Sequence, residues 1–234
     1  MEETTYVSQE NFENNLNQFI DHTLLKVDSS IKSVEDLCTE ALENSFFSVC
    51  IAPFHINFAK RILRGSQVKI CTVIGFPNGY STADSKNFET RNALEAGATE
   101  IDMVMNVSAL KSQRFDHIFQ EIEDIKNICG STTLKVILET SLLSDTEKVL
   151  ASAVAKAAGA DFIKTSTGFS GGGATVEDIK LMRTIMGPAL GVKASGGIRD
   201  KLSAIAMIEA GANRLGCSAG INIIKGTSVE TGDY

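Results

Sequence analysis

The regular alternation of short β-branched segments with longer amphipathic segments most limits how this chain can fold. Between the strand-like segments, stretches such as 55–65 and 144–160 carry apolar residues at helical spacing. Such alternation implies parallel strands joined by right-handed crossovers, and eight units in 234 residues favour a closed (β/α)8 barrel (TIM barrel) of the α/β class over an open sheet. The eight segments are 19–25, 46–52, 69–75, 100–106, 133–139, 161–167, 191–197 and 213–218.

The whole chain, 1–234, is predicted to form a single domain. We expect the barrel to occupy about residues 20–225, after a short N-terminal extension and before a flexible tail at 226–234. No linker rich in Pro, Gly or Ser divides the sequence, and no GxGxxG fingerprint follows the first strand segment. The missing fingerprint argues against a dinucleotide-binding sheet.

Local signals mark where the helices begin and end. A hydroxyl residue precedes a carboxylate by three positions at Ser33, Ser144 and Thr175, which predicts helix caps there. The tripeptide Ala-Gly-Ala recurs at 96–98, 158–160 and 210–212, each time between a predicted helix and the next strand. We expect each central glycine to leave its helix in a left-handed conformation.

Composition limits the cellular setting and the partners. The net charge of −7 argues against nucleic-acid or anionic-membrane partners, and no window approaches the roughly 18 apolar residues of a membrane span. The acidic start of the chain lacks the features of a signal peptide, so we expect a cytoplasmic protein. Five widely spaced cysteines without a CxxC pair suit reduced core thiols better than disulfides.

Charged residues inside four successive strand segments carry most of the chemical information: Asp102, Lys135, Lys164 and Lys193. The simplest interpretation of a strand lysine is an amine that reaches solvent at the strand's start or edge, and Lys135 fits it. Lys164 and Lys193 fit it less well, because each stands just before a Ser/Thr/Gly segment at the end of its strand. In a barrel, sites form at that end.

Two inward lysines on neighbouring strands would lie within about 6 Å of each other, since parallel strands are ~4.8 Å apart. At an effective dielectric of ~20 their repulsion is about 3 kcal/mol, or about two pKa units, and burial acts in the same direction. Lys164 is therefore expected to be partly neutral near pH 7, and a neutral amine attacks carbonyls to form Schiff bases. Asp102 would relay protons, or would alternatively pair with Lys135 on the next strand.

Glycine-rich segments follow the last three strands, at 168–175, 195–199 and 216–220. Late loops of such barrels commonly hold phosphate, because glycines let backbone N–H groups approach its oxygens. The predicted binding residues in and beside these segments include Thr167, Arg199 and Gly216.

Metal chemistry has little support in the sequence, and no cofactor is expected. The three histidines are far apart, and His55 and His117 stand in helical patterns. Only His22 is placed to line the pocket, together with Asp21 and Thr23.

Five motifs together resemble the deoxyribose-phosphate aldolases, class I aldolases with a (β/α)8 barrel. They cover nearly the whole chain in order: IDHTLL, VIGFPNG, EIDMVMN, DFIKTSTGF with GGAT after it, and GVKASGGIR. The resemblance implies reversible cleavage of 2-deoxy-D-ribose 5-phosphate to acetaldehyde and D-glyceraldehyde 3-phosphate, in deoxyribonucleotide catabolism and without metal or organic cofactor.

The resemblance also implies roles for individual residues. Lys164 would be the Schiff-base nucleophile, with Asp102 and Lys193 as the proton relay and Cys50 as a pocket cysteine. Phosphate would contact Gly172, Gly196, Gly197 and Ser218. Some relatives carry a lysine where this chain has Phe169, so a phosphate contact from that side chain is missing here. Some also use a C-terminal tyrosine in the proton step on the enamine carbon, a role that would fall to Tyr234; a terminus without a role is the alternative.

Two other functions stay open at this point. One is a phosphate-binding barrel isomerase or synthase, since SGGIR also occurs as a phosphate turn in such barrels. The other is a non-catalytic sensor of sugar phosphates, which would keep the glycine loops without the amine chemistry. In each case the partner is a small sugar phosphate, and a homodimer is compatible with the sequence.

Overall fold

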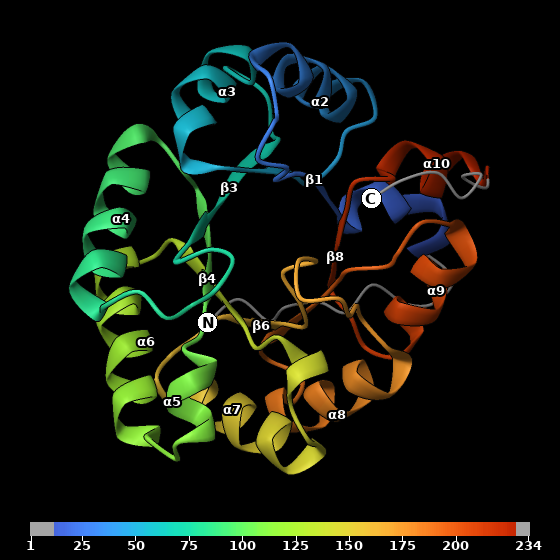
Figure 1. Ribbon diagram of the computed structural model, residues 1–234. Helices are drawn as coiled ribbons and strands as arrows, with labels where there is room; N and C mark the ends of the chain where they lie inside the picture. The colour runs from blue at the N-terminus through green and yellow to red at the C-terminus, as the bar shows by residue number, and fades with distance from the viewer. Residues whose placement is uncertain (1–11, 228–234) are drawn as a thin grey trace.

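Eight parallel strands close into a barrel in the computed structural model, which describes residues 12–227 (Figure 1). Each strand pairs with its neighbours in sequence, and β8 pairs with β1 to complete the ring. This confirms the predicted (β/α)8 architecture. The strands are Ile20–Leu24 (β1), Ser48–Ile51 (β2), Lys69–Ile74 (β3), Glu100–Val104 (β4), Thr133–Ile137 (β5), Phe162–Lys164 (β6), Gly191–Ser195 (β7) and Arg214–Cys217 (β8).

Helices surround the barrel in chain order, as Figure 1 shows in the view down its axis. The α-helices are Ile31–Glu43 (α2), Ile56–Ile62 (α3), Ala83–Ala96 (α4), Val107–Lys111 (α5), Phe115–Cys129 (α6), Asp145–Ala157 (α7), Val176–Met186 (α8), Lys201–Glu209 (α9) and Gly220–Lys225 (α10). Short 3₁₀ turns lie at Glu13–Phe19 (η1), Pro53–His55 (η2) and Thr140–Leu142 (η3). Within residues 12–227, no helix is both long and apolar enough to cross a membrane.

The predicted caps are mostly confirmed. Ser144 and Glu147 form a reciprocal capping box at the start of α7, and the Thr175 side chain accepts the Asp178 N–H at the start of α8. The prediction for Ser33 was wrong, because α2 begins three residues earlier and Ser30 caps it by accepting the Ser33 N–H. Ser33 itself stands inside the first turn.

The central glycines of the Ala-Gly-Ala repeats behave as predicted. Gly97, Gly159 and Gly211 have φ of 112°, 88° and 116°, in the left-handed region that favours glycine. Each lets the chain leave a helix and enter the following strand. These three hinges set the start of β4, β6 and β8.

Two different interiors result from the alternation of side chains along each strand. The main apolar core packs between the outer face of the barrel and the helices, and Ile101, Val136 and Val192 belong to it. The inner face instead carries charged side chains at buried positions, including Asp102, Lys135 and Lys193. All five cysteines are buried and free, as predicted from their spacing.

Candidate functional site

A network of ion pairs fills the inside of the barrel. The Lys135 ammonium lies 2.7 Å from Glu100 and 2.9 Å from Asp102. On the opposite side, Arg214 pairs with Glu100 at 2.8 Å and also with Asp21. Lys135 is fully buried, so its interpretation as an amine that reaches solvent was wrong. Carboxylates inside the barrel compensate the positive charge of Lys135 instead.

Asp102 stands at the centre of this network and contacts three ammonium groups. Its Oδ1 accepts from Lys135, whereas its Oδ2 accepts from Lys164 at 2.9 Å and from Lys193 at 2.8 Å. Burial alone would raise the pKa of Asp102, but the three lysines outweigh it and hold that pKa well below its usual range. The carboxyl group is therefore ionised near neutral pH. Asp102 therefore pairs with both lysines of the predicted site and also with Lys135.

Lys193 is more enclosed by protein than the sequence indicates. It is fully buried and pairs with Asp21 at 2.5 Å in addition to Asp102. Burial opposes its charge, but Asp102 and Asp21 raise the pKa of Lys193 well above its ordinary value. Lys193 therefore stays an ammonium ion near neutral pH.

Lys164 and Lys193 are register partners on β6 and β7, which confirms that they stand at the same depth. Repulsion between the two amines does not describe their electrostatics by itself, however, because Asp102 Oδ2 lies in contact with both. Among the described residues the ion-pair network contains four cations and three carboxylates, so it is balanced when one amine is neutral. Lys164 has only one carboxylate contact and also lines a cavity.

This cavity opens at the carboxyl ends of the strands and has a volume of about 570 Å³. Lys164 lines it together with glycines from the loops after β6 and β7 and with Gly216 on β8. A cavity of this size suits a small-molecule ligand. Of the residues predicted from sequence, those that line it are Thr23, Lys164, Thr167, Gly196, Gly197, Gly216 and Ser218.

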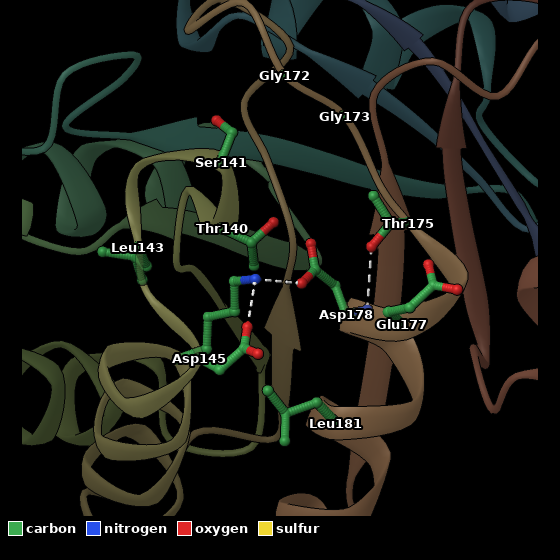
Figure 2. Close-up of a pocket in the computed structure, with 11 residues that line it drawn as sticks. Thr140, Ser141, Leu143, Asp145, Gly172, Gly173, Thr175, Glu177, Asp178 and Leu181 are labelled. Atoms are coloured by element: carbon green, nitrogen blue, oxygen red, sulfur yellow. Dashed lines mark hydrogen bonds and ion pairs between the residues drawn. The ribbon is translucent and has the colours of Figure 1, made fainter.

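Three predicted binding residues lie elsewhere. Cys50 is fully buried beside Cys71, its register partner on β3, and Arg199 is exposed outside the set that lines the cavity. Gly172 lines a different pocket, of about 460 Å³, between η3 and the start of α8. Figure 2 shows that pocket, where the Lys148 ammonium already bridges Asp145 and Asp178.

His22 was expected in the cavity but points the other way. It follows the inward-facing Asp21 on β1, so its ring lies outside the barrel, 2.6 Å from Glu40 and against Phe46. Tyr234 lies outside the described residues.

Several residues of the site could not be predicted from the sequence. The loop after β1 forms one wall of the cavity, and a carboxylate after β5 holds the loop after β6: Glu139 accepts the Thr167 N–H at 3.2 Å. Glu100 and Arg214 were missed in the ion-pair network. In the sequence, each is a charged residue at the start of a predicted buried strand. Charged residues are also common at exposed strand ends, so this signal does not indicate a buried ion pair.

One group of possible metal ligands occurs among the described residues: Cys50, Cys71 and Asp102. Hydrogen bonding to Cys71 lowers the pKa of the Cys50 thiol to about 7. Asp102 is already shared by three ammonium groups, whose charge repels a cation at this position. The donor set therefore does not fit a metal ion.

Comparison with known proteins identifies the family. Residues 16–226 match the model of the DeoC/LacD family aldolases. The chain belongs to this family. A DeoC-type relative, the deoxyribose-phosphate aldolase of Brevibacillus brevis, is 54% identical over 220 residues, which are 94% of this chain and 100% of the relative.

Other members of the DeoC/LacD family agree with this assignment. The deoxyribose-phosphate aldolase of Lactococcus lactis subsp. cremoris is 54% identical over 211 residues, covering 90% of this chain and 96% of the relative. A solved structure, the tetrameric deoxyribose phosphate aldolase from Aeropyrum pernix, has a TM-score of 0.85 at 32% identity and covers 91% of each chain. The family is thus supported by sequence and by fold.

Proposed function

We propose that this chain reversibly cleaves 2-deoxy-D-ribose 5-phosphate to D-glyceraldehyde 3-phosphate and acetaldehyde through a Schiff base on Lys164. The observation that carries this proposal is the place of Lys164 in the cavity wall, with Asp102 between it and Lys193. Membership of the DeoC/LacD aldolases supports it. In the cell the reaction would serve the breakdown of deoxyribonucleotides.

The neutral Lys164 amine attacks the C1 aldehyde of the open-chain sugar, and the resulting carbinolamine loses water to give an iminium ion. The C2–C3 bond then breaks. Its electron pair moves toward the iminium nitrogen to form an enamine, while the C3 hydroxyl gives up its proton and becomes the aldehyde of glyceraldehyde 3-phosphate. Protonation of the enamine at C2, followed by hydrolysis, releases acetaldehyde and restores the amine.

In this proposal, Asp102 and Lys193 form the proton relay and stabilise the charge that develops at Lys164. The low pKa of Asp102 keeps it ionised, so it accepts hydrogen bonds and stabilises the cationic iminium at Lys164. Lys193 donates to the same carboxylate oxygen as Lys164. A water held beside this group would carry protons to and from the carbinolamine.

The phosphate end would lie at the opposite side of the cavity. Gly196, Gly197 and Ser218 line the cavity, as do Thr167 and Gly216. Backbone N–H groups that glycines leave open suit phosphate oxygens. Cys50, Gly172 and Arg199, which do not line the cavity, would act on the substrate only indirectly.

The proposal is tested by turnover of 2-deoxy-D-ribose 5-phosphate, with acetaldehyde and glyceraldehyde 3-phosphate both measured. We expect both products in equal amounts, unchanged by EDTA, and a loss of about 10⁴-fold or more in Lys164→Met. Lys32→Met serves as the control, because Lys32 is exposed, and this variant should keep full activity. Binding of the sugar phosphate without these products would contradict the proposal and favour a sensor or a barrel isomerase.

The assembly and the end of the chain stay predictions. We propose a homodimer, which sedimentation of the purified chain tests; the Aeropyrum pernix relative is tetrameric.

For Tyr234, removal of that residue alone should slow proton exchange at the acetaldehyde methyl group if it acts on the enamine carbon. Unchanged exchange would leave the tyrosine without a role.

A further inference from the structure

Ser195, the last residue of β7, has a hydroxyl group that the proposed mechanism does not use. Ser195 is among the residues that line the cavity although it is only 5% exposed, and its Oγ is buried without a hydrogen-bond partner among the described residues. Its backbone is fixed, because the Ser195 N–H donates to Thr165 Oγ1 at 3.0 Å and that hydroxyl donates back to the Ser195 carbonyl at 2.9 Å. The backbone of Ser195 is therefore held in place, while the bonding capacity of its hydroxyl is unused.

A buried hydroxyl without a partner lowers the stability of a fold, so most such groups are satisfied. Ser195 lines the cavity, so rotation about its χ1 can turn the hydroxyl toward a bound molecule that supplies the missing partner. Room for the hydroxyl exists only because β8 carries a glycine opposite it: a Cβ on Gly216 would lie 2.1 Å from Ser195 Oγ. The Ser195 hydroxyl thus lies against Gly216, another residue that lines the cavity.

The position of Ser195 along β7 indicates which part of a ligand it meets. Lys193 and Ser195 share a face of the strand, about 7 Å apart, and Ser195 is the nearer to the carboxyl end. Gly196 and Gly197 follow directly and line the cavity. Ser195 therefore stands between the amine end of the site and the glycine segment.

We propose that the Ser195 hydroxyl hydrogen-bonds the substrate hydroxyl on the carbon next to the phosphate-bearing carbon, and so selects hydroxylated acceptor aldehydes. This rests on the proposed function, in which C1 is bound at Lys164 and the phosphate lies at Gly196 and Gly197. An extended five-carbon chain between those ends places its C4 hydroxyl just before the phosphate. In the direction of synthesis, this hydroxyl belongs to glyceraldehyde 3-phosphate.

The test is a cycle in which the hydroxyl is removed from the enzyme, the substrate or both. Acetaldehyde is the donor, and the acceptor is either D-glyceraldehyde 3-phosphate or 3-oxopropyl phosphate, which lacks the hydroxyl. We expect the wild-type preference for the hydroxylated acceptor, as a ratio of kcat/KM values, to shrink by about tenfold in Ser195→Ala. The cycle cancels the different intrinsic reactivities of the two aldehydes.

Ser166→Ala is the matched control. Ser166 is also buried, and its Oγ also lacks a partner, but it is not among the residues that line the cavity. This variant should keep the wild-type preference. Ser195→Ala should also unfold at no lower temperature than the wild type, because no internal hydrogen bond is lost.

The possible failures are distinguishable. Turnover with the same acceptor preference in wild type and Ser195→Ala would overturn the Ser195 contact and leave the aldolase reaction standing. An equal loss of preference in Ser166→Ala would also overturn it, since the effect would not depend on the cavity. A wild-type chain without aldol turnover would overturn the proposed function, and the contact with it.

Discussion

At the scale of single residues, Asp102 determines the electrostatics of the site. One carboxylate contacts Lys135, Lys164 and Lys193, which lie on three consecutive strands. The two oxygens have different partners, because Oδ1 accepts from Lys135 and Oδ2 accepts from both Lys164 and Lys193. A buried carboxylate in this position stabilises positive charge wherever it forms among the three amines.

The interior pair of Lys135 with Glu100 and Asp102 is expected to matter for stability. Lys135→Met removes the cation and leaves both buried carboxylates short of a partner, so we expect a loss of about 3 kcal/mol or more in the free energy of unfolding. Lys32→Met is the control: this lysine is 72% exposed and pairs with Asp36, and its loss should leave the free energy of unfolding nearly unchanged. Urea unfolding of both variants measures the difference. Similar losses would contradict the interior network.

At the scale of elements, two glycines of the cavity are required for different reasons. Gly216 on β8 has ordinary backbone angles, but a Cβ there would lie 2.1 Å from Ser195 Oγ and 3.0 Å from Lys193 Cε. Gly197 after β7 has open space around it and a φ of 80°. Space is the requirement at Gly216, and left-handed backbone is the requirement at Gly197.

These requirements predict different effects of alanine. Gly216→Ala should displace Lys193 and Ser195 and lower kcat/KM by about 10²-fold, because displacements near 1 Å at a reacting centre cost that much. Gly197→Ala should cost about 1–2 kcal/mol of stability through its backbone conformation. Steady-state kinetics and thermal unfolding of both variants test this contrast. A fully active Gly216→Ala would contradict the close packing around Lys193.

The order of elements could be predicted from the sequence because each strand and helix carries a local signal. The spacing of apolar residues, the Ser144 cap and the Ala-Gly-Ala hinges are all read within a few residues. Contacts across the barrel have no such signal. Arg214 and Asp21 pair across 193 positions, and only ring closure between β8 and β1 brings them together.

The position of loops was the least predictable part of the site. GFSGGGAT reads as one phosphate-type segment, yet Gly168 lines the cavity while Gly172 faces the pocket of Figure 2. The chain turns between them, and Gly171 has a φ of 76°. Composition indicates that a glycine-rich loop bends, but not which of its residues face the ligand.

At the scale of the whole molecule, the protein has an ionic interior inside the barrel and an apolar layer around it. Cys38 on α2 and Cys129 on α6 belong to the apolar layer, and burial raises the pKa of each thiol to about 11. A thiol with a raised pKa favours the folded state only while it is protonated. Its contribution is complete below the unfolded-state pKa of about 8.5 and is lost as the pH rises toward the folded-state value.

Alkaline pH should therefore weaken the outer layer through these thiols. Between pH 8 and pH 10, the free energy of unfolding of the wild type should fall by about 1–2 kcal/mol per thiol relative to a Cys38→Ala/Cys129→Ala variant. Urea unfolding at a series of pH values measures the difference between the two proteins. A difference that does not change with pH would mean that the thiols are not buried as described.

The central claim is that Lys164 forms the covalent bond to the substrate. Borohydride added during turnover of 2-deoxy-D-ribose 5-phosphate should reduce the Schiff base and fix the substrate's carbon on this one lysine. Peptide mass spectrometry should then find one adduct per chain, on the peptide that contains Lys164, and none in Lys164→Met. An adduct on Lys193 or another lysine, or turnover without any adduct, would contradict the account.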